Sequence, residues 1–267
     1  MATLKEKLDL SGRLALVTGA TGNIGKLMAL TLAEMGADLL LLDRPNAPFA
    51  PLQEEIAALA SVRVDCLPCD LESGEQRQAL IATLVESKRA LHVLVNNAAF
   101  VGSSDLEGWA VPFAEQRIDT WRRAFEVNLT AVFELCQGLL PLMQASTGAS
   151  IVNIGSIYGI CGPDWSLYAG TSMANPAAYA ASKGGLIQLT RWLATTLAPG
   201  VRVNAISPGG VWRNQPESFV DKYQSRTPLG RMASEDDFAG ALAYLASDLS
   251  AYVTGQNLVV DGGWSAW

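Results

Sequence analysis

A tyrosine and a lysine four residues apart, Tyr179 and Lys183, are the pair in this sequence best suited to moving a proton. In an α-helix this spacing places both side chains on one face. A free phenol titrates near roughly 10, but a neighbouring ammonium and a helix N-terminus both favour the phenolate and lower its pKa. Asn175 and Pro176 are typical of an N-cap and a first helical residue, which would put Tyr179 in the first helical turn. We therefore predict acid–base chemistry at Tyr179.

Ser156 is the second candidate for contact with a reacting group, because it follows a predicted buried strand. Ligands of α/β sheets bind at the carboxyl ends of the strands, where a serine hydroxyl can hydrogen-bond a reacting oxygen. Taken singly, a serine is usually structural and a Tyr/Lys pair often packs at a surface. The single histidine, His92, leaves no room for a dispersed catalytic histidine, and four scattered cysteines favour neither a metal site nor redox chemistry.

Three glycines, Gly19, Gly22 and Gly25, lie between a predicted strand and a predicted helix. Glycines at this spacing allow a tight turn, close approach of the backbone to a pyrophosphate, and close packing of helix on strand. The second strand ends at Asp43, whose carboxylate suits the ribose 2′-hydroxyl of NAD and would repel the 2′-phosphate of NADP. Arg44 is adjacent, and it could instead pair with a phosphate, stack on adenine or face solvent. The pattern favours NAD over NADP.

Short apolar runs alternate with longer segments of helical spacing along all 267 residues, which indicates a parallel sheet covered on both faces. We expect one doubly wound α/β domain of the Rossmann type with about seven strands, and 49% hydrophobic residues suffice for its core. Net charge is −7 without a basic run, which argues against nucleic-acid or membrane partners. The predicted strands are residues 13–18, 38–42, 62–64, 92–95, 150–154, 201–206 and 257–260, and the main predicted helices are 24–35, 76–86, 119–142, 176–197 and 235–246.

Together with the glycine turn, the segments 95–99, 154–157 and 179–183 resemble the short-chain dehydrogenase/reductase family, and segments 203–209 and 253–263 are similar to its compact branch. The resemblance covers residues 1–267 as one NAD-binding domain. It implies a catalytic set of Asn128, Ser156, Tyr179 and Lys183, in which Asn128 helps to hold a water and Lys183 also holds the nicotinamide ribose. The cofactor residues that the glycine turn and the resemblance together suggest are Gly19, Gly22, Asn23, Ile24, Gly25, Asp43, Asp70, Leu71, Asn97, Ala98, Tyr179, Lys183, Pro208, Gly209 and Val211.

Some positions depart from the family pattern. Asn23 replaces a glycine of the compact branch, and asparagine tolerates left-handed backbone. Asp70 is expected at adenine, or alternatively as the cap of the following helix. Insertions near 100–118 and 160–175 and a substrate loop near 210–228 predict an enlarged, partly aromatic pocket, or else an oligomer contact. Substrate contacts are expected from Trp165, Trp212 and Arg213, with Lys222 and Arg226 either assisting or merely solvated.

These observations predict an NAD-dependent oxidoreductase that interconverts a secondary alcohol and a ketone on a carbohydrate-like or anionic small molecule. Segments 170–176 and 214–217 are similar to family members encoded with nonulosonic-acid sugar pathways. The alternatives are a 3-oxoacyl-thioester reductase that uses NADPH and, in another class, a non-catalytic NAD-binding regulator or scaffold. The resemblance also implies a homodimer or homotetramer. The charged N-terminus lacks the apolar core of a signal peptide, so we expect a cytoplasmic protein.

Overall fold

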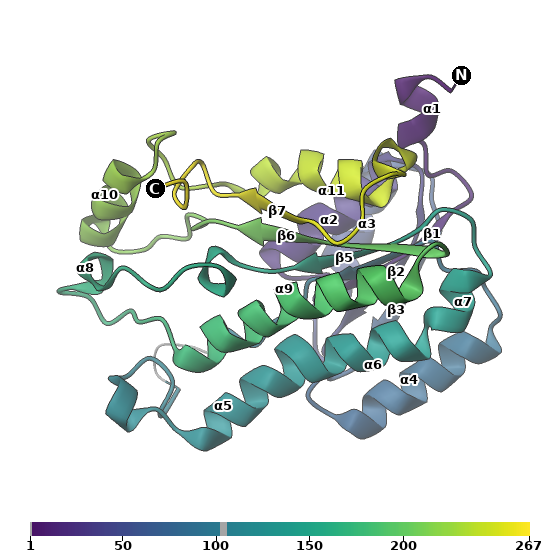
Figure 1. Cartoon of the computed structure of the whole chain (residues 1–267). Coiled ribbons are helices and arrows are strands. Elements are labelled where there is room, and N and C mark those ends of the chain that lie inside the picture. The colour runs from purple at the N-terminus through teal and green to yellow at the C-terminus, as the bar shows by residue number, and fades with distance from the viewer. Residues whose placement is uncertain (1, 102–105) are drawn as a thin grey trace.

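A computed structural model of the chain describes residues 2–101 and 106–267. Its centre is a seven-stranded parallel sheet in the order β3-β2-β1-β4-β5-β6-β7 (Figure 1). The order reverses direction beside β1, which creates the crevice where doubly wound sheets bind their ligands. The predicted single doubly wound domain is confirmed. The strands are β1 (Leu14–Thr18), β2 (Asp38–Asp43), β3 (Val64–Pro68), β4 (Val93–Asn96), β5 (Ala149–Ile154), β6 (Val201–Pro208) and β7 (Asn257–Val260).

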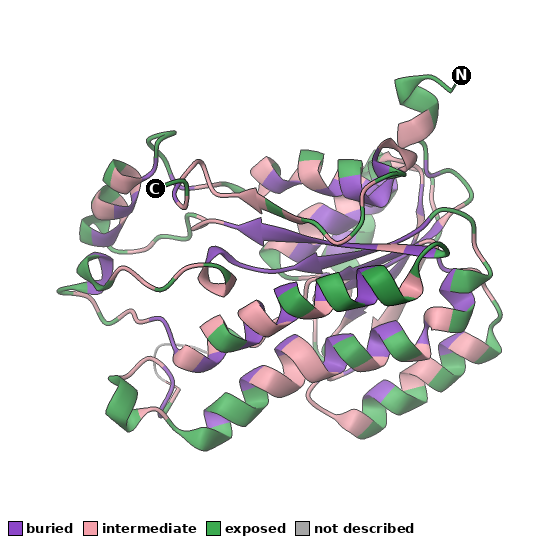
Figure 2. Ribbon diagram, viewed as in Figure 1, coloured by how far each residue is buried: buried purple, intermediate pink, exposed green. Residues whose placement is uncertain are grey.

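Helices cover both faces of the sheet and bury two separate cores. In β1, Leu14 and Leu16 face one core while Ala15 and Val17 face the other, as the two-residue period of a strand requires. The buried strands form the purple centre of Figure 2, and the outer sides of the helices are exposed. The first core packs under α4 (Gly74–Glu86), α6 (Ala131–Gly138), α7 (Leu140–Gln144) and α9 (Ala177–Leu197), and the second under α2 (Asn23–Glu34), α3 (Phe49–Leu59) and α11 (Ala239–Ala246).

The short elements lie at the ends of the sheet and in its connections. In Figure 1, α8 and α10 lie next to each other beyond the arrowheads of β5, β6 and β7. This is the carboxyl end of the strands, where a site is expected. The remaining elements are α1 (Leu4–Leu8), α5 (Ile118–Phe125), α8 (Trp165–Tyr168), α10 (Glu217–Arg226), the 3₁₀ turns η1 (Phe113–Glu115), η3 (Ile157–Gly159), η4 (Glu235–Phe238) and η5 (Asp248–Ser250), and the π-helical η2 (Glu126–Thr130).

Several local predictions were wrong at this level. The third strand begins at Val64 rather than at 62 and ends on a proline, Pro68, which the strand tolerates because it is at the sheet edge. The expected helix over 119–142 is broken into α5, η2, α6 and α7. The N-cap of α9 is Pro176, not Asn175. Tyr179 nevertheless lies in the first turn, as predicted.

None of the helices within the described residues is long and apolar enough to cross a membrane. The cysteines at 66 and 69 are both free, and Cys69 is buried in the first core. Burial raises the pKa of both thiols, which disfavours the reactive thiolate. This agrees with a packing role for the C-x-x-C segment.

Candidate active site

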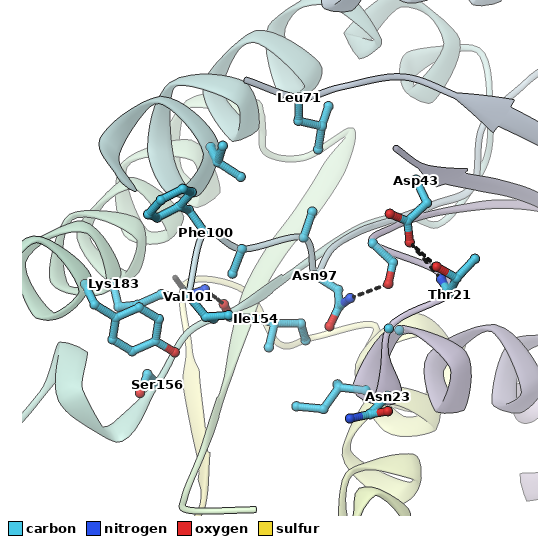
Figure 3. Close-up of a pocket in the computed structure, with 18 of the residues that line it drawn as sticks. Thr21, Asn23, Asp43, Leu71, Asn97, Phe100, Val101, Ile154, Ser156 and Lys183 are labelled. Atoms are coloured by element: carbon cyan, nitrogen blue, oxygen red, sulfur yellow. Dashed lines mark hydrogen bonds between the residues drawn. The ribbon is translucent and has the colours of Figure 1, made fainter. Parts of the chain in front are cut away.

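A cleft of about 930 Å³ lies at the carboxyl ends of the strands. Figure 3 shows its two ends, with Thr21 and Asp43 at one and Ser156 and Lys183 at the other. The structure thus brings the predicted cofactor residues and the predicted reacting residues to one cavity. The cleft is lined by these predicted residues: Gly19, Gly22, Asn23, Ile24, Gly25, Asp43, Asp70, Leu71, Asn97, Ala98, Ser156, Tyr179, Lys183, Pro208, Gly209, Val211 and Arg213.

The glycine turn between β1 and α2 is a cradle that side chains would fill. Gly19 has a φ of +62°, and a Cβ there would lie 2.9 Å from the Cα of Ala98. A Cβ on Gly25 would collide with the carbonyl oxygen of Gly19. The first helical residue of α2 is Asn23, so the unpaired N–H groups of this helix begin at the cleft. The cradle therefore fits the pyrophosphate of a dinucleotide.

Asn23 does not use a left-handed backbone, contrary to the sequence-based argument for its tolerance. Gly22 is the N-cap of α2 with a φ of −72°, and Asn23 continues into the right-handed helix. The replacement of glycine is compatible with the turn because no positive φ is required at this position.

Thr18 and Asn97 hold the cradle against β4, and sequence analysis missed Thr18. The Thr18 hydroxyl accepts hydrogen bonds from the backbone N–H groups of Asn97 and Ala98, at 3.0 and 2.9 Å. The Asn97 amide donates to the carbonyl oxygens of Thr18 and Gly19. These bonds fix the close approach of the two loops, which is the reason for glycine at position 19. A threonine directly before the glycine turn was the available signal.

Asp43 ends β2 and is oriented by a second missed residue, Thr21. One carboxylate oxygen of Asp43 accepts from the backbone N–H and the hydroxyl of Thr21, at 2.9 and 2.8 Å. The other accepts from the backbone N–H of Arg44 at 2.8 Å. Two oxygens offer about four acceptor positions and three are occupied, so about one remains for a ribose hydroxyl. The Arg44 side chain is exposed at the rim of the same cleft.

Asp70 lines the cleft and does not cap the following helix. The cap of α4 is Ser73, whose hydroxyl accepts from the N–H of Gln76. Asp70 instead accepts from the N–H of Glu72 and closes a turn. The helix-cap alternative is therefore wrong.

Leu71 is held from behind by a buried arginine that sequence analysis missed. Arg77 is 2% exposed, donates to the Leu71 carbonyl, and forms ion pairs with Glu126 and Glu134 at 2.5 and 2.6 Å. Each of the three guanidinium nitrogens has a carboxylate or carbonyl partner, which offsets the desolvation of the buried charge. This network joins α4 to η2 and α6 behind the cofactor end of the cleft.

At the other end of the cleft, Ser156 comes from the turn after β5, and Tyr179 and Lys183 come from the first two turns of α9. Ser156 follows β5 and is buried, and its Oγ accepts from the N–H of Tyr158 at 3.1 Å. The Lys183 ammonium is 2% exposed, donates to the carbonyl of Ile154 at 2.7 Å, and lies 5.8 Å from the centre of the Tyr179 ring. This carbonyl anchors the lysine beside the tyrosine.

The electrostatics of this end differ from the prediction. Burial raises the pKa of Tyr179, and a hydrogen bond with Ser156 opposes that rise. Burial also lowers the pKa of Lys183 to about 8. The predicted lowering of the phenol pKa by the ammonium and the helix N-terminus is therefore outweighed by desolvation. These opposite shifts move the two pKa values apart, so the Tyr179 phenol keeps its proton near neutral pH in the absence of ligand.

Asn128 is not in the cleft but directly behind it, within the π-helical η2. Its side chain is buried, with the amide donating to the Ser182 hydroxyl at 3.0 Å and Oδ1 accepting from the N–H of Phe100 at 2.6 Å. Ser182 in turn donates to the carbonyl of Tyr179. Asn128 therefore ties α9 to the loop after β4, and the π-helical turn is the kind often found at functional sites.

The predicted substrate residues divide. Arg213 lines the cleft and is paired with Glu235 at 3.0 Å. Trp212 is 54% exposed and lines neither the cleft nor the second cavity described below, so its prediction as a substrate contact is not supported by its position. Trp165 lies apart from the cleft, on that second cavity. The insertion near 100–118 falls partly on residues 102–105, which lie outside the described residues.

The cations of the substrate loop are paired with the 160–175 insertion. Lys222 donates to the carbonyls of Ser166 and Ala169, and Arg226 pairs with Asp164 at 2.6 Å. Neither is a free clamp for an anion nor a merely solvated charge. They fasten α10 to α8.

The fold and the shared cleft define a dinucleotide-binding oxidoreductase of the α/β class. The chain belongs to the short-chain dehydrogenase/reductase family: residues 19–265 match a family described as enoyl-(acyl carrier protein) reductase. It is 33% identical to the 3-oxoacyl-(acyl-carrier-protein) reductase FabG of Thermotoga maritima, over 96% of this chain and 99% of that protein. It is 34% identical to galactitol 2-dehydrogenase (L-tagatose-forming) of Cereibacter sphaeroides, over 97% of each. The chain is thus an oxidoreductase of CH–OH groups.

Solved structures give the same fold with both nicotinamide cofactors. A short-chain dehydrogenase of Leptospira borgpetersenii with bound NAD⁺ is 30% identical, with a TM-score of 0.83 and coverage of 99% and 96%. A gluconate 5-dehydrogenase of Burkholderia cenocepacia in complex with NADP and tartrate is 29% identical, with a TM-score of 0.84 and coverage of 99% and 100%. The similarity therefore establishes a nicotinamide-binding fold without choosing between NAD and NADP.

Proposed function

We propose that this protein is an NAD-dependent dehydrogenase that interconverts a secondary alcohol and a ketone on a polar, carbohydrate-like small molecule. The observation that carries the proposal is the shared cleft, in which Ser156, Tyr179 and Lys183 lie opposite a glycine cradle and a carboxylate. An idle NAD-binding protein would not require a serine, a tyrosine and a buried lysine beside each other at the reacting end. The regulator or scaffold alternative is therefore disfavoured.

In the proposed reaction the chain positions the substrate and moves one proton. A nicotinamide cofactor, when bound, supplies the hydride acceptor or donor. Ser156 would donate a hydrogen bond to the reacting oxygen, and Tyr179 would take the hydroxyl proton during oxidation and return it during reduction. Lys183 would stabilise the phenolate and hold the nicotinamide ribose, while Asn128 would help to hold a water for proton relay. Binding in the cleft also excludes water from the reacting oxygen.

Preference for NAD rests on Asp43. Its carboxylate lies at the end of β2, oriented by Thr21 toward the glycine cradle, where a second negative charge from a 2′-phosphate would be repelled. The exposed Arg44, at the rim of the same cleft, is a neighbouring group that favours NADP. The gluconate 5-dehydrogenase neighbour with NADP shows that this family also accepts the phosphorylated cofactor.

The substrate class is proposed from the site and from the names of relatives. Galactitol 2-dehydrogenase and a galactose dehydrogenase of Rhizobium meliloti are among the similar proteins, at 34% and 33% identity. Because Arg213, Lys222 and Arg226 are all engaged within the chain, a neutral carbohydrate fits better than an anion. The FabG likeness supports a second candidate, reduction of a 3-oxoacyl thioester with NADPH, against which Asp43 counts.

We also propose a homodimer or homotetramer. Large apolar side chains are exposed on the neighbouring helices α5, α6 and α9, including Trp121, Phe133 and Trp192. A face of this kind is typical of an interface between identical subunits. Light scattering of the purified protein would give a mass of at least two chains, and a monomer would contradict the proposal.

The test of function is turnover across neutral sugars, polyols, sugar phosphates and acyl thioesters, each with NAD(H) and NADP(H). Tyr179→Phe serves as the inactive control. We expect NAD-linked oxidation of a neutral polyol or sugar that is lost in the control. NADPH-linked reduction of an acyl thioester would overturn both the cofactor and the substrate proposals. Equal turnover by Tyr179→Phe would overturn the assigned proton donor.

A further inference from the structure

A second cavity of about 580 Å³ lies between residues 110–116 and 163–175, which belong to the two predicted insertions. Its described lining shares no residue with the cofactor cleft and contains no charged side chain. Cavities of this volume are in the range that holds small ligands. A neutral ligand is therefore favoured, because no described residue of the lining could neutralise a charge.

One wall of the second cavity is the first turn of the helix that carries Tyr179. Ala177 and Ala180 line the cavity there with methyl groups only. Gln116 also lines it, and its Oε1 accepts from the backbone N–H of Ala177 at 3.0 Å. This bond supplies the N-terminal cap that Pro176 cannot provide through its side chain. The 110–116 segment is thus fixed to the catalytic helix.

A second wall connects the cavity to Ser156. Tyr168 lines the cavity, and its hydroxyl lies 2.5 Å from that of Tyr158. Tyr158 in turn donates its backbone N–H to the Ser156 hydroxyl. Asn175 lines the cavity beside them, is 6% exposed, and its Oδ1 has no hydrogen-bond partner among the described residues. The second cavity thus adjoins the reacting end of the cleft through one hydrogen-bonded layer.

The remaining lining combines flat aromatic faces with small polar groups. Trp165 and Phe113 are 57% and 83% exposed, which is unusual for side chains of this size. Thr171 and Ser172 lie on the same cavity with Gln116. An aromatic face packs against the C–H face of a saturated ring, and hydroxyl and amide groups exchange hydrogen bonds with ring hydroxyls.

We propose that the second cavity binds a neutral, hydroxyl-bearing saturated ring, with Trp165 as its packing surface. Only the origin of this ring depends on the proposed function. The ring is either the distal part of a two-ring substrate or a separate small sugar. The chemistry of recognition is the same in both cases. The proposal extends the site beyond the single reacting carbon to a second sugar ring.

The binding test uses saturation-transfer NMR on the full-length protein with maltose, cellobiose and lactose at millimolar concentration, and glucose 6-phosphate as the charged comparison. We expect transfer to ring protons of at least one neutral disaccharide and none to the phosphate at this site. Trp165→Ala should weaken binding about fivefold or more. Trp212→Ala is the matched control, an equally exposed tryptophan off the cavity. No transfer in the wild type, or equal loss in both variants, would overturn the proposal.

Further measurements distinguish a substrate ring from a separate ligand, and they distinguish failure of this proposal from failure of the proposed function. Tyr179→Phe should bind the disaccharides as the wild type does, because binding at the second cavity does not need the phenol. If the ring belongs to a substrate, Trp165→Ala raises KM for a two-ring substrate and leaves KM for its single-ring counterpart unchanged. If it is a separate ligand, disaccharide transfer persists when a single-ring substrate saturates the cleft. Loss of turnover with retained disaccharide binding would contradict the proposed function alone.

Discussion

The two ends of the active site are built in different ways. At the cofactor end, the backbone fixes the shape of the site. Gly19 and Gly25 allow the close approach of the loops, and the hydroxyls of Thr18 and Thr21 hydrogen-bond to Asn97 and Asp43 and hold the loops at the strand ends. At the substrate end, side chains fasten the substrate loop to the 160–175 insertion, with Lys222 and Arg226 joining α10 to α8. The first end leaves little freedom for variation, and the second can change without disturbing the sheet.

This difference explains how one scaffold can serve several substrates. Residues at strand ends inherit the rigidity of a sheet buried on both faces, whereas loops carry specificity. Two cations that could bind an anionic substrate, Lys222 and Arg226, are instead engaged between α10 and α8. Substitutions at the two ends should accordingly separate turnover and cofactor binding from substrate affinity.

The largest effect should come from the reacting end. Tyr179→Phe removes the proposed proton donor and should reduce kcat by about 10²- to 10⁴-fold. The dissociation constant of NAD, measured by titration of protein fluorescence, should change far less than kcat, because the glycine cradle and Asp43 are left intact. Trp165→Ala gives the contrast, with kcat retained. A Tyr179→Phe enzyme with nearly normal kcat would place the proton donor elsewhere.

The sequence could predict the central residues of both ends because the signals for these residues are local. Spacing alone placed Tyr179 and Lys183 on one helix face, and strand–turn–helix context located the cradle and Asp43. The unpredicted parts depend on contacts between distant segments. Gln116 as the cap at Ala177, Arg77 behind Leu71, and Thr21 on Asp43 each join residues whose proximity only the folded chain reveals.

Burial was the other effect that spacing could not reveal. The argument from Lys183 and the helix end gave the wrong sign for the Tyr179 pKa, because desolvation depends on how completely the surrounding elements close. The orientation of Trp212 also could not be read from the sequence, and its position does not support the predicted substrate contact. Its place in the substrate loop was predicted, but the side chain lies off both cavities.

The buried Lys183 should make stability depend on pH. Its pKa falls from an ordinary 10.5 to about 8 in the folded chain, so the unfolded chain binds more protons between these values. The destabilisation is fully present below pH 8 and is relieved as pH rises toward 10.5. Its full size is about 3 kcal/mol at most.

The measurement is urea unfolding at pH values from 7 to about 10.5 for the wild type and Lys183→Met. The difference in unfolding free energy, Lys183→Met minus wild type, should shrink as pH rises. Taking this difference cancels the contributions of the cysteines and tyrosines, which titrate in both proteins, to the pH dependence of the unfolding free energy. Parallel curves would mean that Lys183 keeps its ordinary pKa in the folded chain.

A smaller effect is expected at the rim of the cofactor end. Asp43→Ser removes the carboxylate that would repel a 2′-phosphate and the acceptor for ribose hydroxyls. KM for NAD should rise about tenfold, and kcat/KM for NADP should increase. Adding Arg44→Met should lower the gain with NADP and leave NAD unaffected. An unchanged ratio between the two cofactors would remove Asp43 as the basis for the NAD preference.

The smallest effect tests the fastening of the substrate end. Arg226 pairs with Asp164 and lies 4.8 Å over the Trp264 ring, and a half-exposed pair with a cation–π contact contributes about 1 kcal/mol. Arg226→Met should lower the free energy of unfolding by that amount or less and raise substrate KM, with NAD affinity unchanged. Lys26→Met is the matched control, since its pair with Glu55 lies on the cofactor side. If both variants changed substrate KM alike, the α8–α10 contact would have no special connection with substrate binding. The proposed separation between cofactor binding at one end and substrate affinity at the other would then be wrong.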